Sequence, residues 1–133
     1  VTNGGQNLRL NPNDGTIAAT DANLNPGTPM ISGAAYTNNF AGTTSTVLFV
    51  TDGGKLYRQD PPNNGTLVEI GSLGITVDAN NGFDIGGRSN TAYAIMSVGS
   101  TSKIYTINTA TGLATAAGDF AVKVRGMTLG LGF

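Results

Sequence analysis

The sequence has no His, no Cys and no Trp, and only 11% of its 133 residues are charged. Without histidine and cysteine the chain lacks the most common general base, every thiol nucleophile and all disulfides. It also lacks the usual protein ligands of zinc, haem and iron–sulfur clusters. Most classes of enzyme depend on one of these groups, so we expect a protein that is not an enzyme and that needs no cofactor.

The few charges nearly cancel, because seven Lys and Arg stand against eight Asp and Glu. This balance argues against a surface dedicated to nucleic acid or to an acidic membrane. No apolar run approaches the roughly 18 residues of a membrane-spanning helix, so we expect no membrane insertion. The sequence also has no basic stretch followed by an apolar stretch, the mark of a signal peptide, and we interpret it as a mature chain.

Asparagine, threonine and glycine take the place of charge, with 14 Asn, 18 Thr and 20 Gly in the chain. Threonine favours strands, whereas asparagine and glycine favour turns that require positive φ. Good helix formers such as Lys, Glu and Arg are few, so helices supported by charge ladders are not expected. The composition predicts an all-β fold, and such charge-poor surfaces are common on secreted β-proteins and assembled fibres.

Two interleaved landmarks repeat along the chain with a similar period. The turn glycines of one landmark, 50 and 47 residues apart, are Gly15, Gly65 and Gly112. The strand glycines of the other, 49 and 44 residues apart, are Gly33, Gly82 and Gly126. Periods of about 40–50 residues with four strands each are typical of propeller blades. The repeats therefore predict propeller-like, four-stranded antiparallel blades.

The repeat divides a single propeller-like domain, residues 1–133, into two whole blades and two fragments. The expected strands are Met30–Asn38, Thr46–Thr51, Lys55–Gln59 and Thr66–Ile70 in the blade at 30–71, and Gly82–Ile85, Ala92–Val98, Lys103–Asn108 and Leu113–Ala117 in the blade at 81–118. The fragments are a partial blade at 7–21 and a terminal strand at 124–133. Propellers close with at least about four blades, so we expect an incomplete ring.

Four motifs carry a resemblance to a known family. They are Asn38-Asn39, Pro61-Pro62-Asn63-Asn64-Gly65-Thr66-Leu67, Gly82-Phe83-Asp84-Ile85 and the run from Ile104 to Gly112. With these motifs the chain resembles a β-propeller-like domain of unknown function found in secreted bacterial proteins, and it matches the later blades of that domain. The resemblance implies a secreted, extracellular or cell-surface protein, and it brings no assigned activity and no catalytic residues.

The terminal strand alternates apolar residues with glycine or threonine. The apolar side chains of one face are Met127, Leu129, Leu131 and Phe133. A free apolar edge strand invites aggregation unless it has a receptor. It is either the last core strand of its own subunit or a strand donated to a neighbour by β-augmentation. In the second case its receptor is the unfinished N-terminal blade of the next subunit, which presents Leu8, Leu10 and Ile17.

Residues 78–84 place carboxylate and amide oxygens at alternate positions around a glycine, loosely like a calcium-binding loop. The candidate ligands are Asp78, Asn80 and Asp84. The bidentate glutamate on which such a loop ends is missing, because Glu69 is the only glutamate in the chain. A turn between blades explains the same residues. A further alternative is that Asp78 and Asp84 act as an acid–base pair for glycoside hydrolysis.

We therefore predict a non-catalytic structural subunit of a secreted bacterial extracellular filament, which assembles head to tail with copies of itself by β-strand complementation. The alternative is an extracellular adhesin or glycan-binding propeller module that binds surface glycans through loops at one end of its blades. A third hypothesis is a fragment of a longer propeller with no independent role. Assembly into a closed oligomer in place of an open polymer is a further alternative.

Overall fold

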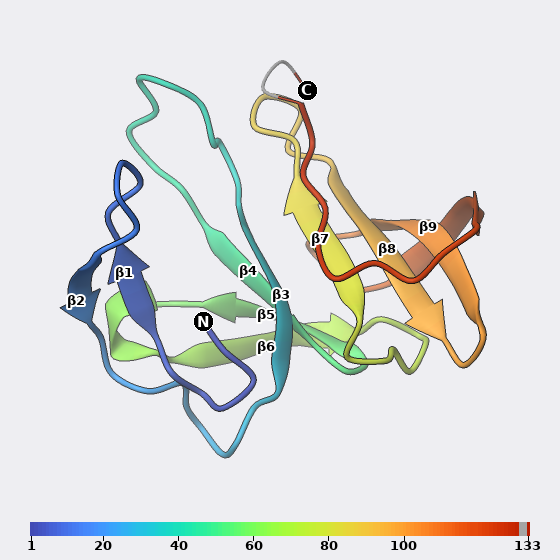
Figure 1. The fold of residues 1–133 in the computed structure, drawn as a ribbon, viewed down its shortest axis with the longest axis horizontal. Helices are drawn as coiled ribbons and strands as arrows, with labels where there is room; N and C mark the ends of the chain where they lie inside the picture. The colour runs from blue at the N-terminus through green and yellow to red at the C-terminus, as the bar shows by residue number, and fades with distance from the viewer. Residues whose placement is uncertain (131–132) are drawn as a thin grey trace.

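The computed structural model describes residues 1–130 and 133 and is built from antiparallel strands (Figure 1). Ten strands form one two-stranded sheet and two four-stranded sheets, and within each sheet the strands follow one another in chain order. The all-β class and the two four-stranded antiparallel sheets predicted from the repeats are confirmed. The described residues form no closed ring.

The three sheets follow one another along the chain. The N-terminal hairpin consists of β1 (Leu8–Leu10) and β2 (Ile17–Thr20). The first sheet consists of β3 (Ile31–Tyr36), β4 (Leu48–Asp52), β5 (Lys55–Gln59) and β6 (Leu67–Ser72), with a short 3-10 helix at Pro62–Asn64. The second sheet consists of β7 (Asn81–Ile85), β8 (Ala92–Val98), β9 (Thr101–Ile107) and β10 (Ala114–Phe120).

Each predicted strand but one corresponds to an observed strand. Strands β5 and β8 match residue for residue, and the others differ by up to three residues at an end. The exception is the terminal strand predicted at 124–133, because residues 124–130 form no strand. Glycines at 126 and 130 weaken strand propensity there. No neighbouring strand in the described part of this chain offers the segment a ladder.

The two four-stranded sheets pack face to face through their first strands, β3 and β7. A Cβ atom on Gly33 of β3 would stand 2.8 Å from the Phe83 Cβ of β7. The missing side chain therefore lets the two backbones approach. The main core lies between these sheets, and its largest fully buried side chains include Leu56, Leu73 and Ile85. The sheets also meet where Gly71 of β6 lies against the backbone of the β9–β10 turn and where the Ala114 amide donates to the Leu73 carbonyl at 3.0 Å, so more than one close approach fixes their stacking.

A smaller core lies on the opposite face of the first sheet, toward the hairpin. It contains Leu24, Ile31, Leu48, Val50 and Leu67. The hairpin is tied to this side through polar contacts, because Asn7 Nδ2 donates to the Pro62 carbonyl at 2.8 Å. The chain leaving the hairpin is held in the same way, with the Asn25 amide donating to the Gly65 carbonyl at 2.8 Å. The hairpin is thus fixed to the first sheet mainly by hydrogen bonds.

Two asparagines join the loops at one end of the sheets. Asn38 and Asn90 both have positive φ, at 51° and 54°. The Asn38 amide donates to Asn90 Oδ1, and Asn90 Nδ2 donates to Asn38 Oδ1, each at 2.8 Å. Asparagine tolerates this left-handed conformation better than most other side chains. The pair links the loop after β3 to the loop after β7.

The outermost strand of each four-stranded sheet pairs with an irregular register. The β9–β10 ladder shifts between Ala116 and Gly118, and the β5–β6 ladder shifts between Leu56 and Tyr57. Strand β10 is the more exposed of the two outer strands. Such bulges bend a strand and increase its local twist.

Because the backbones approach closely at Gly33, we expect the addition of one methyl group there to destabilise the fold. In Gly33→Ala the new Cβ would overlap Phe83 and Thr51 in a packed interface. We expect this overlap to lower the free energy of unfolding by about 1–3 kcal/mol, as urea denaturation would measure.

The control for this prediction is Gly118→Ala, whose Cβ meets no described atom within 4 Å. We expect the free energy of unfolding of this control to change by no more than about 0.5 kcal/mol. Equal stability of the two variants would contradict the stacking.

Candidate functional site

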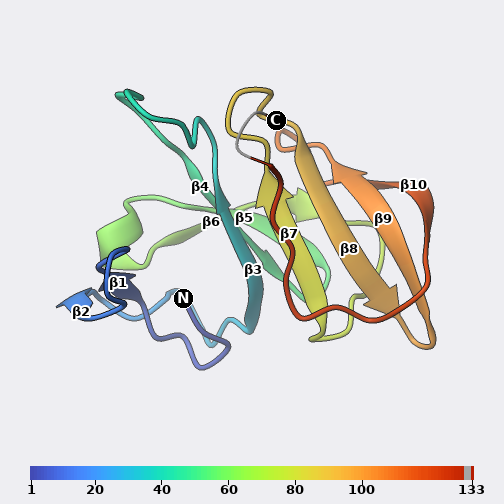
Figure 2. The same ribbon diagram turned by 45° about the horizontal axis from the view of Figure 1, so that its top comes forward.

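The C-terminal segment, residues 121–130 and 133, lies along β7 on the face of the second sheet that points away from the first sheet (Figure 1, Figure 2). A Cβ atom on Gly82 of β7 would stand 2.6 Å from the Met127 amide nitrogen and 2.7 Å from Met127 Cγ. The segment therefore approaches β7 at Gly82 as closely as β7 approaches β3 at Gly33. Met127 and Leu129 are half-buried as a result.

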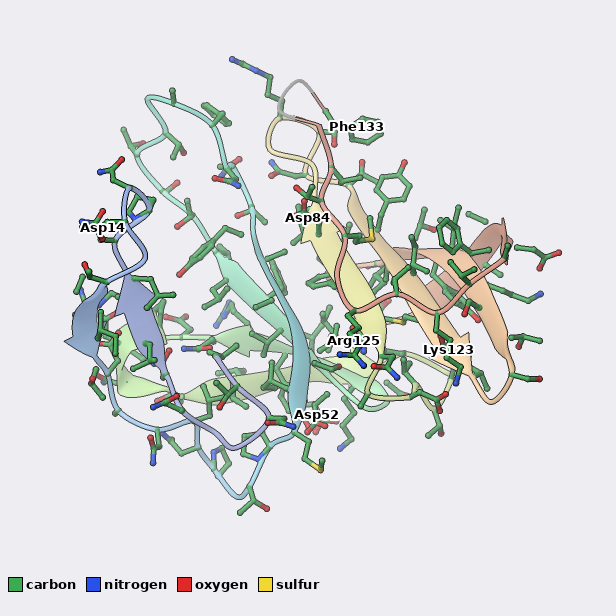
Figure 3. The ribbon with its side chains drawn as sticks, viewed as in Figure 1. Asp14, Asp52, Asp84, Lys123, Arg125 and Phe133 are labelled. Atoms are coloured by element: carbon green, nitrogen blue, oxygen red, sulfur yellow. The ribbon has the colours of Figure 1, made fainter. Side chains whose placement is uncertain are left out.

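A carboxylate of β7 holds the backbone of the segment. Asp84 Oδ2 accepts a hydrogen bond from the Leu129 amide at 2.7 Å, and Asp84 Oδ1 accepts one from the Ile85 amide at 2.8 Å. Lys123 pairs with Asp78 at 2.9 Å where the segment begins. In Figure 3, Lys123 lies on the lower part of the segment, and Asp84 lies beside its upper part. One side chain thus supplies the acceptor that a neighbouring strand would supply in a sheet.

Phe133 is held by the loop that follows β7. Its carbonyl oxygen accepts a hydrogen bond from the Arg88 amide at 2.9 Å. Its ring meets the Tyr93 ring edge-on, with centroids 5.6 Å apart and planes at 75°. The Arg88 guanidinium lies 5.1 Å from the centroid of the Phe40 ring. This is a cation–π distance. Both ends of the segment are therefore attached to the second sheet and its loops.

Apart from Leu129, whose amide is held by Asp84, the backbone of the segment between these attachments has no hydrogen-bond partner among the described residues. Within the described part of the chain, residues 121–129 make no backbone–backbone hydrogen bond. The segment is extended and apolar on the face toward β7, and it lacks the ladder that defines a strand. Unpaired N–H and C=O groups on an extended segment are a template for pairing with another chain.

The N-terminal hairpin is the second unfinished element. Side chains of Leu10 and Ile17 are 56% and 60% exposed, and Leu8 is half-buried. Among the described residues, β1 pairs only with β2, so one edge of β1 is unpaired. Arg9 supports the hairpin with two hydrogen bonds to Asp21, at 2.9 and 3.0 Å.

The hairpin turn is fixed by its own polar residues. Asp14 Oδ1 accepts hydrogen bonds from the Thr16 amide at 2.9 Å and from the Thr16 hydroxyl at 2.7 Å. These bonds, the amide first, lower the pKa of Asp14 below its ordinary value. They do so because they favour the charged carboxylate. The turn is therefore fixed by hydrogen bonds within the hairpin itself.

The structure does not bring the two sets of predicted interface residues together within one chain. The hairpin that carries Leu8, Leu10 and Ile17 lies on one side of β3, and the C-terminal segment lies on the other side (Figure 1). Figure 3 shows the same separation between Asp14 at the hairpin tip and Phe133. Met127, Leu129 and the 47% exposed Phe133 contact or flank their own second sheet, and Leu131 lies outside the described residues.

The candidate calcium ligands already have partners within the chain or lie on its surface. Asp78 pairs with Lys123, and Asp84 accepts the Leu129 amide. Asn80 is exposed. In residues 1–130 and 133, no cluster of three or more acidic, His or Cys side chains is arranged to hold a metal ion. The structure thus gives these two aspartates structural roles in attaching the C-terminal segment, which the sequence reasoning missed.

A third open surface, also missed from the sequence, lies on β3. Ala34 is exposed, and Met30 and Tyr36 are 61% and 43% exposed. A hollow of about 460 Å³ runs past the start of this strand, lined in part by Val1, Thr2, Met30 and Ser32. The smaller core includes Ile31 of β3 but leaves Ala34 and Tyr36 exposed.

These features define a class of all-β chain whose antiparallel four-stranded sheets stack through their first strands. The chain matches the family model described as Domain of unknown function (DUF4394) over residues 1–129, and it belongs to this family. No curated protein and no solved structure shows significant similarity to it. Within residues 1–130 and 133, the structure contains no helix with the length and hydropathy required to cross a membrane.

The role of Asp84 can be tested by removing its carboxylate. In Asp84→Ala the Leu129 amide loses its acceptor. We expect the variant to lose about 1–2 kcal/mol of folding free energy and to exchange the Leu129 amide hydrogen faster within the peptide that covers residues 126–130. Hydrogen exchange followed by mass spectrometry measures the second effect.

The control for this prediction is Asp119→Ala, whose side chain is 90% exposed and pairs with Lys103. We expect exchange at 126–130 to stay unchanged in this control. The same unchanged exchange in Asp84→Ala would contradict the anchoring role.

Proposed function

We propose that this chain is a non-catalytic structural subunit of a secreted bacterial extracellular filament, with propeller-like blades that copies of the chain complete for one another. The observation that carries the proposal is an incompletely paired element on each side of β3, namely a two-stranded hairpin and a C-terminal segment without a ladder. The hairpin presents the unpaired edge of β1 together with Leu10 and Ile17. The C-terminal segment presents unpaired backbone at the other end.

Two different unfinished ends favour a head-to-tail arrangement. A contact between unlike surfaces is heterologous, and it propagates into an open polymer when its rotation does not close a ring. In the proposed contact, residues 124–133 of one subunit complete the hairpin sheet of the next through Leu8, Leu10 and Ile17. Exposed Leu10 and Ile17 gain about 1.5–3 kcal/mol each when buried, and new ladder hydrogen bonds add about 1 kcal/mol apiece.

Composition supports the same function and the proposed location. Only 11% of the residues are charged, and the net charge is −1. Stacked copies therefore repel one another weakly. The chain has no cysteine. An extracellular filament of this protein would thus depend on packing and hydrogen bonds in place of disulfides. Neutral, threonine-rich surfaces suit a subunit that meets many copies of itself.

The function predicts that removal of either end stops assembly. We expect deletion of residues 124–133 to leave soluble monomer and no filaments, with negative-stain microscopy and light scattering as the measurements. The double variant Leu10→Asn/Ile17→Asn tests the other end without touching a core, because both side chains are exposed in the subunit. Leu113→Asn, at a side chain that is 54% exposed and outside both ends, is the matched control.

Filaments that persist in both the deletion and the hairpin variant would overturn the proposed function. A wild-type protein that stays monodisperse and monomeric, and that binds glycans on an array, would favour the glycan-binding module instead.

A further inference from the structure

One stacking step is used twice within the chain. In β3, Gly33 faces β7, and a Cβ there would stand 2.8 Å from the Phe83 Cβ. In β7, Gly82 faces the C-terminal segment, and a Cβ there would stand 2.6 Å from the Met127 nitrogen. Phe83 and Met127 each follow the glycine of their own segment and contact the glycine of the preceding one. In each step, the glycine of one segment packs against a residue of the following segment. That residue is the one directly after the following segment's own glycine.

The series of stacked segments runs from β3 through β7 to the C-terminal segment. At one end a glycine has no residue packed against it, and at the other end a residue has no glycine to pack against. Gly126 of the C-terminal segment is the third glycine, and no described atom lies within 4 Å of where its Cβ would stand. Ala34 of β3 follows the first glycine and is exposed. Successive strand residues point to opposite faces, so Ala34 points away from β7. Its cross-strand partner Val50 belongs to the smaller core, which confirms that face.

We propose that Gly126 of one copy receives Ala34 of a second copy, so that β3 of the second copy stacks on the C-terminal segment of the first. This inference rests on the proposed filament function and names the contact that joins its subunits. The partner is a second copy of this chain because the chain already makes the same step twice, and the two unmatched halves belong to opposite ends of one subunit.

The surroundings of Ala34 fit an incoming extended segment. Met30, just before β3, and Tyr36, at its end, flank this residue with 61% and 43% of their surface exposed. Alanine is smaller than the phenylalanine and methionine that make the step elsewhere, so the segment can approach β3 more closely. The hairpin with its unpaired β1 edge lies on the same side of the first sheet.

The inferred contact leaves the C-terminal segment in place. Met127 stays packed on Gly82 of its own subunit, and Asp84 keeps its hydrogen bond to the Leu129 amide. The neighbour uses the opposite face of the segment, on which Gly126 lies. Subunits therefore join as preformed surfaces, and no part of the fold has to open before they do.

The closing experiment uses two variants that are silent in the free subunit. Gly126→Val adds a side chain where the subunit has open space, and Ala34→Arg changes an exposed residue. We therefore expect the circular dichroism spectra of both variants to match that of the wild type. We expect each to raise the concentration at which assembly begins by at least about tenfold, because the added atoms occupy the contact. Gly118→Val, also in open space but on β10, is the matched control and assembles normally.

Mixing the two variants gives a sharper result. Gly126→Val retains an intact β3 surface, and Ala34→Arg retains an intact C-terminal segment, so an equimolar mixture can form a single junction. We expect light scattering to show a dimer containing one of each variant, with no longer species. Normal assembly of Gly126→Val or of Ala34→Arg would overturn the contact and leave the filament function standing.

Other outcomes separate the contact from the function. Closed rings of wild-type protein that both variants abolish would keep the contact and overturn the open filament. A wild-type protein that remains monomeric at every concentration would overturn the filament function, and with it the contact.

Discussion

The close approach of extended segments at glycine is the constraint on which the rest of this structure depends. Gly33 lets β7 stack on β3, and Gly82 lets the C-terminal segment stack on β7. A side chain at either position would separate the backbones and open the interface around it. The main core, with Phe83, Ile85 and Met96, lies beside the first of these contacts. With few charges and no disulfide, the chain relies on this backbone proximity to place its sheets.

Much of the fold is predictable because its signals are local. The repeat and its turn glycines indicate eight of the ten strands to within a few residues. The spacing of Gly33 and Gly82 reveals the repeat before any contact is known. The same two glycines then prove to be positions at which neighbouring segments approach closely. From the sequence, the recurrence of these glycines indicates a repeat, and the structure shows that it also marks where segments stack.

The C-terminal segment shows why the site was harder to predict. Alternation at Met127, Leu129 and Phe133 indicates correctly that one face is apolar, but periodicity cannot say whether a ladder partner exists. The structure satisfies the Leu129 amide with the Asp84 side chain, a contact across 45 residues of sequence that no local pattern encodes. The same carboxylate looked like a metal ligand because a lone aspartate gives no hint of its partner.

The bulges in the outer strands have a consequence for where copies can meet. A long, flat outer edge would let sheets join sideways, as in amyloid. In β10 the register shifts at Gly118, and the Lys103–Asp119 pair places charge beside it. A twisted and charged edge discourages sideways growth along the flank of the stack. The hairpin and the C-terminal segment, which lie on opposite sides of β3, differ from one another, so any chain of copies joined through them has a direction.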